Sequence, residues 1–226
     1  MIRNTLVISD THIPFEHRNY LDFCKRIHKA FKCVRVIHIG DLVDNNAISY
    51  HENDPDGWSP EDEMKEADSH LRGWFRAFPK VYLCRGNHDH LVDRKAKTVG
   101  LPTRCFQSFR DIWKLPKGWK DAFQWEFDGV LYKHGTGASG KYSHIQTAID
   151  ARQSTVIGHT HATAGIEYIA SEKDCIFGAN VGCGIDRHSY AMKYGRDFRR
   201  KPIIACGIIT NSKHGNVGHV IPMEMR

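Results

Sequence analysis

Short apolar runs that end abruptly in polar residues recur in the first part of the chain, with helical segments between them. The predicted strands are Thr5–Ser9, Val34–Ile39 and Val81–Cys84, and the predicted helices are Arg18–Phe31 and Glu61–Phe78. Strands that alternate with helices pair in parallel, and open α/β sheets place their sites just beyond the carboxyl ends of the strands. The alternation therefore predicts both the type of sheet and the edge at which chemistry occurs.

Beyond residue 120 the strands follow one another more closely. Asp128-Gly129 is a two-residue hairpin signal between two of them, Phe123–Phe127 and Val130–His134. A helix is predicted at about Tyr142–Arg152, and later strands at Thr155–Gly158, Gly165–Ala170, Cys175–Val181, Ile203–Thr210 and Val217–Ile221. We therefore expect a mixed α/β (α+β) architecture of two packed sheets with helices outside, in a single domain over residues 1–226. Asn45–Pro60 is predicted to be a surface loop.

The composition, 41% hydrophobic and 26% charged, is typical of a packed globular protein. No apolar run is long enough for a membrane span, and the N-terminus has no signal-peptide core, so we expect a cytoplasmic protein with no membrane contact. The 7 cysteines are widely spaced without a C-x-x-C pair, which argues against a disulfide framework and a structural zinc site. They are expected to be reduced and mostly buried.

Positive charge is concentrated in the second part of the chain. Residues 1–84 carry 11 basic and 13 acidic groups, whereas residues 85–226 carry 21 and 13, which points to an anionic partner. In the segment Asp186–Lys201 six Lys or Arg residues interleave with Tyr190, Tyr194 and Phe198. Such a segment is either a solvated surface or a contact for a polyanion, and the second interpretation favours a nucleotide or nucleic-acid substrate.

Polar residues follow five of the predicted strands. They form the groups Asp10-Thr-His12, Gly40-Asp41-Leu-Val-Asp44, Gly86-Asn87-His88-Asp89, the single residue His134, and Gly158-His159-Thr160-His161. On an extended chain residues i and i+2 point the same way, so each D-x-H or H-x-H pair can present two donors to one cavity. Mixed nitrogen and oxygen donors suit manganese, iron, nickel or zinc and not calcium. The glycines permit close backbone approach at such a site.

In these five groups, taken in order, the chain resembles the calcineurin-like metallophosphoesterases, whose signature is D-x-H, G-D-x-x-D, G-N-H-D/E, an isolated His, and G-H-x-H. The resemblance implies a four-layer αββα sandwich and a hydrolase, either a phosphatase or a phosphodiesterase, with a dinuclear metal centre. It implies two divalent ions, with manganese the first choice and iron, zinc or nickel as alternatives. One ion would bind Asp10, His12, Asp41 and His161, the other Asn87, His134 and His159, and Asp41 would bridge the two.

The resemblance also assigns roles beyond the ligands. His88 would protonate the leaving oxygen, Asp44 would hydrogen-bond that imidazole, and Asn87 would also contact substrate. Arg85 either contacts the substrate phosphate or pairs with an acidic neighbour. Asp44 and Asp89 have an alternative interpretation as turn-forming or capping carboxylates. His38, inside an apolar strand, is expected to be structural.

Three alternatives concern the activity itself. The G-D-x-x-D group of phosphoprotein phosphatases continues with an Arg, whereas Asn45 and Asn46 follow Asp44 here, which argues against that activity. A small non-nucleotide phosphomonoester is an alternative substrate. A non-catalytic interaction module of the same fold is a further alternative, and the intact set of ligands argues against it.

Overall fold

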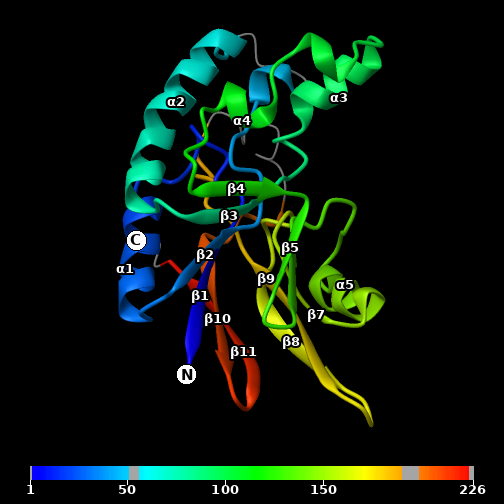
Figure 1. Ribbon diagram of the computed structural model, residues 1–226. Coiled ribbons are helices and arrows are strands. Elements are labelled where there is room, and N and C mark those ends of the chain that lie inside the picture. Colours follow the sequence, from blue (N-terminus) through cyan, green and yellow to red (C-terminus); the bar gives the residue numbers. More distant parts are fainter. Residues whose placement is uncertain (1, 51–55, 190–198, 224–226) are drawn as a thin grey trace.

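A computed structural model describes residues 2–50, 56–189 and 199–223. Its strands form two mixed sheets (Figure 1). The first sheet has the order β11-β10-β1-β2-β3-β4, with the bounds β1 Arg3–Ile8, β2 Arg35–His38, β3 Val81–Cys84, β4 Trp119–Ala122, β10 Ala205–Ser212 and β11 Gly215–Pro222. The second has the order β5-β6-β7-β9-β8, with the bounds β5 Gln124–Phe127, β6 Val130–Lys133, β7 Ser154–Ile157, β8 Ala164–Ala170 and β9 Cys175–Val181.

The strands that carry the polar groups are neighbours and parallel within each sheet. In the first sheet β1 pairs with β2 and β2 with β3, all in parallel. In the second sheet β6 pairs with β7 in parallel, while the β5–β6 pair is an antiparallel hairpin. The carboxyl ends of three strands of one sheet and two strands of the other therefore emerge side by side, as the alternating pattern predicts.

The helices lie outside the two sheets. They are α1 Tyr20–Ala30, α2 Pro60–Ala77, α3 Leu91–Thr98, α4 Phe109–Ile112 and α5 Ser143–Ala151, with short 3-10 helices η1 Asn46–Ile48 and η2 Thr103–Cys105. Side chains of α1, α2 and α4, among them Tyr20, Trp74 and Phe109, share a core with the first sheet. Figure 1 shows α1 and α2 on one side of the molecule and α5 on the other, against the second sheet.

A second core lies between the sheets. Val7 and Ile37 of the first sheet pack there with Val156, Phe177 and other side chains of the second. Along β1 the buried side chains therefore alternate, since Leu6 and Ile8 face the helices while Val7 faces the other sheet. The two cores make four layers, which confirms the predicted αββα sandwich of two mixed sheets.

The predicted elements agree with the structure to within a few residues at their ends. Besides the two 3-10 helices, three elements were not predicted: α3, α4 and the edge strand β4, whose sequence Trp-Lys-Asp-Ala has no apolar run. The loop prediction for Asn45–Pro60 is wrong at its beginning, because Asn45 and Ser49 are buried and η1 forms there. Residues 190–198 of the basic segment Asp186–Lys201 lie outside the described residues.

Two further expectations concern the state of the cysteines and the presence of a membrane span. All seven cysteines are free, and five of them are buried, whereas Cys105 and Cys175 are exposed. Within the part of the chain that the structure describes, no helix combines the length and the apolar character that a membrane span requires.

Candidate metal centre

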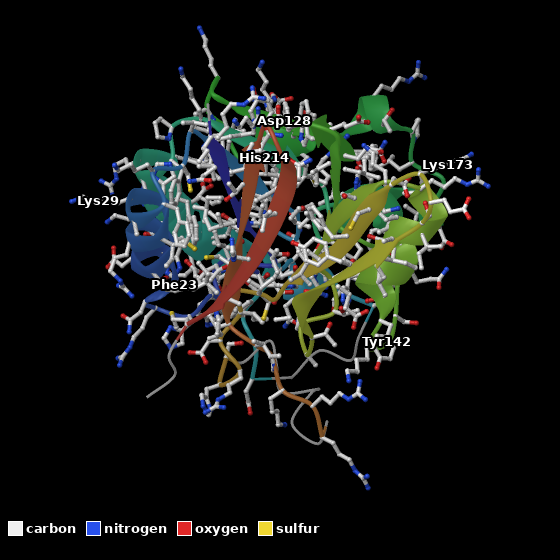
Figure 2. All side chains as sticks on the ribbon, turned by 90° about the horizontal axis from the view of Figure 1, so that it is seen from below. Phe23, Lys29, Asp128, Tyr142, Lys173 and His214 are labelled. Atoms are coloured by element: carbon white, nitrogen blue, oxygen red, sulfur yellow. The ribbon has the colours of Figure 1, made fainter. Side chains whose placement is uncertain are left out.

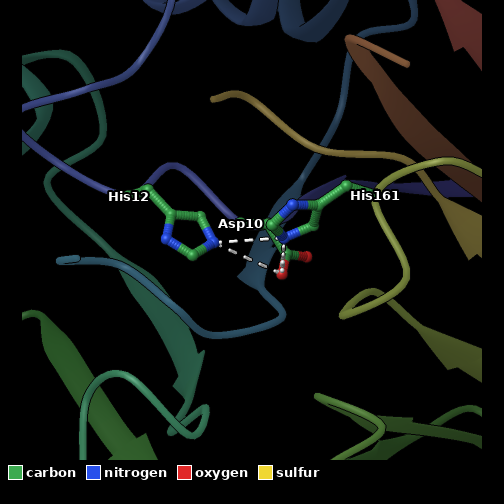
Figure 3. Close-up of side chains that lie close together, drawn as sticks. All are labelled: Asp10, His12 and His161. Carbon is green, nitrogen blue, oxygen red and sulfur yellow. Dashed lines mark hydrogen bonds and ion pairs between the residues drawn. The ribbon is translucent and has the colours of Figure 1, made fainter. Parts of the chain in front are cut away.

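Donor atoms from the five strand ends gather into two sets. The first set joins Asp10 and His12, which follow β1, to His161, which follows β7. The Nε2 atoms of His12 and His161 are 3.1 Å apart, and His161 Nε2 is 3.1 Å from Asp10 Oδ1. Figure 3 shows these side chains pointing toward one another from opposite sides. Two imidazole nitrogens and a carboxylate that lie close together form a donor set suited to a transition metal.

The second set contains the other predicted ligands. His134 Nε2 lies 3.0 Å from Asn87 Oδ1, 3.2 Å from His159 Nδ1 and 3.2 Å from Asp41 Oδ2. Asp41 lies between the sets, since the same Oδ2 is 3.8 Å from His12 Nε2. The structure thus brings together all seven residues that sequence reasoning named as ligands, with Asp41 placed to serve both sets.

These residues fit a pair of divalent cations by their chemistry. In each set, nitrogen and oxygen atoms lie within hydrogen-bonding distance of one another. Two neutral imidazoles whose nitrogens face each other can place only one proton between those two nitrogens. His134 Nδ1 is 3.2 Å from the carbonyl oxygen of Ile39, which favours a proton on Nδ1. The lone pair of Nε2 is then available to a metal ion. Both sets draw ligands from each sheet.

The carboxylates make the site strongly attractive to positive charge. Burial alone would lower the pKa of His134, but Asp41 and Asp10 outweigh it and raise the pKa to about 9. Burial alone would likewise raise the pKa of Asp10, yet His134, His12 and His161 hold it well below the usual range. The charges around these donors are therefore those of a cation site.

The ligands reach the cavity through left-handed backbone rather than by strand alternation. Asp10, His12, Asp41 and His159 have φ angles of 47°, 51°, 49° and 67°. Asp10 and His12 do lie close together, as expected from their i and i+2 spacing. The expected cause, an extended backbone, is wrong. Non-glycine residues in this conformation are strained, and such strain persists where the surrounding structure imposes it, often at functional sites.

Two glycines make the close approach of these loops possible. A Cβ atom built on Gly86 would lie 2.8 Å from Asp41 Cγ and closer still to Asp41 Oδ1. A Cβ atom on Gly158 would overlap Ser9 Oγ and Asp10 Oδ2. The glycines before Asn87 and His159 therefore have the role that the sequence predicted, which is to leave space for the carboxylates of neighbouring loops.

His88 and Asp44 form a pair beside the first donor set. His88 Nδ1 is 2.9 Å from Asp44 Oδ1 and 2.6 Å from the Asp44 carbonyl oxygen. A proton on Nδ1 satisfies both acceptors, which directs Nε2 away from them. Burial alone would lower the pKa of His88, but Asp41 and Asp44 together raise it, so the cationic form is favoured.

A family model described as calcineurin-like phosphoesterase matches residues 3–172 of the 226. The chain belongs to the calcineurin-like phosphoesterase family. This confirms the resemblance found in the five polar groups. No curated protein matches the sequence significantly.

Solved structures of similar fold include other phosphoesterases. A metallophosphoesterase from Sphaerobacter thermophilus has 15% identity over 100% of this chain and 90% of its own, with a TM-score of 0.44. A phosphoesterase from E. coli has 12% identity, 98% and 100% coverage, and a TM-score of 0.42. Vacuolar protein sorting 29 from Cryptosporidium parvum has 12% identity, 99% coverage of both chains and a TM-score of 0.48.

In this family member Arg85 has an acidic neighbour. Its Nε lies 3.6 Å from Asp121 Oδ2, and its guanidinium lies 4.7 Å from the ring centroid of Phe123. Asp121 also receives two hydrogen bonds from Arg110. Arg85, two residues before Asn87 in the sequence, therefore lies against the carboxylate of Asp121. A contact between Arg85 and substrate stays a prediction.

His38 and Asp89 hold the loops of the phosphoesterase site. His38 Nδ1 accepts the N–H of Gly40, and Thr11 Oγ1 lies 3.1 Å from its other nitrogen. Burial lowers the pKa of His38 to about 3, so this histidine is neutral and structural, as its strand position predicts. Asp89 accepts the N–H groups of Leu42, Val43 and Gly86, which ties the loop after β2 to the loop after β3.

Glu63 is a buried residue of the site that sequence reasoning missed. It lies on α2 and accepts the N–H groups of Asn46 and Ala47, each at 2.7 Å, so it fixes the backbone just after Asp44. The neighbouring Asn45 donates its side-chain amide to the His88 carbonyl oxygen. Burial, outweighing the two N–H donors, raises the pKa of Glu63 to about 7. Its position on an amphipathic helix gave no signal of this contact.

Glu63→Gln should destabilise the protein by about 1–3 kcal/mol, because the amide group of glutamine faces one of two backbone N–H donors and leaves it without an acceptor. Urea unfolding measures the effect. Glu61→Gln, on an exposed residue of the same helix whose carboxylate pairs with Lys65, is the matched control and should change stability by less than about 1 kcal/mol. Equal stability of both variants would mean that the Glu63 contacts do not hold the loop.

Proposed function

We propose that this protein is a metal-dependent phosphoester hydrolase with a dinuclear centre and that its substrate is a nucleotide or a nucleic acid. The observation that supports the first part is the convergence of seven donors from five strand ends into two sets that share Asp41. Family membership supports the reaction class. Neither set resembles an ordinary ion pair, because each contains two imidazoles facing each other across a carboxylate.

The donors divide between two ions. One ion would be held by Asp10, His12, Asp41 and His161, and the other by Asp41, Asn87, His134 and His159. Two divalent ions, manganese by preference and iron, zinc or nickel as alternatives, supply Lewis-acid stabilisation of the phosphoryl charge and hydroxide at neutral pH. The neutral amide of Asn87 leaves the centre with more positive charge than a carboxylate there, which favours an anionic substrate.

His88 acts as the general acid in this proposal. The cationic form has protons on both ring nitrogens, and Asp44 accepts the one on Nδ1, so Nε2 carries the proton available to a leaving oxygen. Asp44 is itself buried, and against the effect of burial the positive charge of His12 is the main influence that holds the pKa of its carboxyl at about 2, and a cation bound by His12 would act in the same direction. The acid is therefore paired with a carboxylate that remains charged across the working pH range.

A nucleotide or nucleic-acid substrate is supported by the charge of the chain. Residues 85–226 carry 21 basic and 13 acidic groups, and Arg85 lies next to the ligand Asn87. A small phosphomonoester is the second candidate substrate. The non-catalytic alternative is disfavoured by the intact ligands and by the His88–Asp44 pair, which a binding module does not need.

Metal content tests the dinuclear centre. The protein loaded with manganese and desalted should retain two ions per chain, and chelation should abolish hydrolysis. His161→Ala removes a ligand of the first set and should lower the content to one ion, as measured by inductively coupled plasma mass spectrometry. The matched control is His219→Ala, on an exposed residue of β11. One ion at full activity, or activity that survives chelation, would contradict the proposal.

A substrate panel tests the reaction. With manganese present, we expect hydrolysis of an aryl phosphodiester, a cyclic nucleotide or an end-labelled oligonucleotide at a rate that depends on the metal. The assay should include aryl monoesters, because activity on these alone would favour the small-substrate alternative. Failure on every phosphoester, with two ions bound, would leave the non-catalytic module as the better interpretation.

A further inference from the structure

A cavity of about 530 Å³ lies apart from the metal ligands. Three of its lining residues are arginines that come from two distant parts of the chain. Arg18 and Arg26 lie before and on α1, and Arg187 lies in the loop after β9. We call this the arginine cavity. An anion bound in this cavity would meet guanidinium groups from both parts of the chain.

Arg18 and Arg187 have no acidic partner among the described residues, whereas Lys25 and, more weakly, the charge of Arg26 lower the pKa of the Asp22 carboxyl. Within the described residues, none of the three guanidinium groups forms an ion pair with a carboxylate. Two acids do line the cavity, but Asp22 is paired with Lys25 Nζ at 2.9 Å and Asp186 accepts the N–H of His188. Arg187 donates from Nε to His188 Nε2, and the other N–H groups of Arg18 and Arg187 have no carboxylate partner among the described residues, so they can meet an oxyanion.

The floor of the arginine cavity is apolar. Phe23, Ile204 and Met223 line it and are at least nine-tenths buried. Figure 2 labels Phe23 on α1, near the C-terminal end of β11, where Pro222 completes the floor. A ligand that satisfies both parts combines a phosphate with a less polar group, as each sugar-phosphate unit of a nucleic acid does.

Backbone hydrogen bonds connect the two walls of this cavity to the metal centre. His17 donates its N–H to the Gly184 carbonyl oxygen at 2.8 Å, and Gly184 donates its own N–H to the Asp10 carbonyl oxygen at 2.9 Å. Asp10 belongs to the first donor set. The arginine cavity and the metal centre are therefore built on the same two loops.

We propose that the arginine cavity binds phosphates of a single-stranded nucleic-acid substrate that flank the phosphate at the metal centre. The reaction at the metal centre rests on the proposed function, whereas nucleic-acid binding by the arginine cavity does not. Arg187 opens the basic segment Asp186–Lys201, so the cavity lies where that segment begins. The site selects polymers over small esters because only a polymer spans both places.

Binding of a fluorescent single-stranded oligonucleotide is measured with protein from which a chelator has removed the metal, so that no hydrolysis occurs. The variant Arg18→Ala/Arg187→Ala should bind about tenfold more weakly at moderate salt, and the slope of log K against log salt should fall by about 0.7 for each lost phosphate contact. The matched control is Arg72→Ala/Arg76→Ala, which removes two exposed arginines from α2 and should leave binding unchanged.

Hydrolysis of a small aryl phosphodiester by the manganese-loaded protein separates the two proposals. That ester reaches only the metal centre, so the Arg18→Ala/Arg187→Ala variant should hydrolyse it normally. Normal hydrolysis together with unaltered oligonucleotide binding and salt slope would overturn the arginine cavity and leave the proposed function intact. Weakened binding without any hydrolysis, even by the unmodified protein, would overturn the proposed function and leave the cavity.

Titration with inorganic phosphate distinguishes a polymer site from a site for the free ion. When inorganic phosphate and the oligonucleotide are present at the same total concentration of phosphate groups, inorganic phosphate should compete poorly. Saturable phosphate binding that the double variant loses, with oligonucleotide binding unchanged, would overturn the assignment to a nucleic acid.

Discussion

Replacing His88 with alanine should lower turnover on alkyl phosphoesters by about 10²–10⁴-fold, as expected for loss of a general acid. The alkoxide leaving group of such esters needs a proton, whereas the phenolate of an aryl ester leaves readily without one. Aryl esters should therefore lose much less. The measurement is kcat for a matched pair of alkyl and aryl substrates, and the diagnostic quantity is the ratio of the two losses.

The metal content of the His88→Ala variant decides between two roles for this histidine. His88 also lies near His12 and Asp41, so a ligand role competes with the acid role. Two retained ions are expected. Loss of an ion, or equal losses on both substrates, would assign His88 to metal binding or to structure. His214→Ala, on an exposed residue of the β10–β11 turn, serves as the control, and Asp44→Asn should reproduce the substrate pattern more mildly.

Gly86→Ala should impair the metal centre although Gly86 carries no ligand atom. The added methyl group would overlap the Asp41 carboxylate and lie 2.5 Å from the Asp41 backbone nitrogen, so Asp41 must move. A displacement of about 1 Å at a reacting centre can cost about 10²-fold in rate, and overpacking of this kind costs about 1–3 kcal/mol of stability. We expect turnover to fall by about 10²-fold or more, with weaker retention of manganese.

Gly165→Ala is the matched control for that variant. No heavy atom lies within 4 Å of the position its Cβ would take, so activity and metal content should stay close to those of the unmodified protein. Circular dichroism confirms that both variants fold. A Gly86→Ala protein with normal turnover and two ions would show that the loop after β3 can move away, and that Asp41 is not held in place by it.

The sequence predicted which residues gather better than it predicted how the backbone brings them together. Polar groups at strand ends identify Asp10, Asp41 and His134 because parallel strands bring their carboxyl ends to one edge. The left-handed conformation of four ligands could not be inferred, because aspartate and histidine carry no residue-type signal for it comparable to glycine. The extended-chain reason for the D-x-H pair therefore failed even where the pair itself was correct.

Contacts that depend on tertiary packing were the other part that the sequence left open. Glu63 occurs among other acidic residues at the start of α2, and nothing in that pattern separates it from its exposed neighbours. Only the packing of α2 against η1 brings its carboxylate to the N–H groups of Asn46 and Ala47. The arginine cavity is similar, since Arg18 and Arg187 are far apart in sequence.

The distribution of ligands over both sheets has a thermodynamic consequence. In each donor set, residues after β1, β2 or β3 meet residues after β6 or β7. A cation that binds such a set crosslinks the two halves of the sandwich, and its binding free energy adds to the free energy of unfolding by linkage. With an ion bound, the apolar layer between the sheets and the metal centre at its edge would hold the same two halves together, and the free energy of unfolding would depend on the concentration of free metal ion.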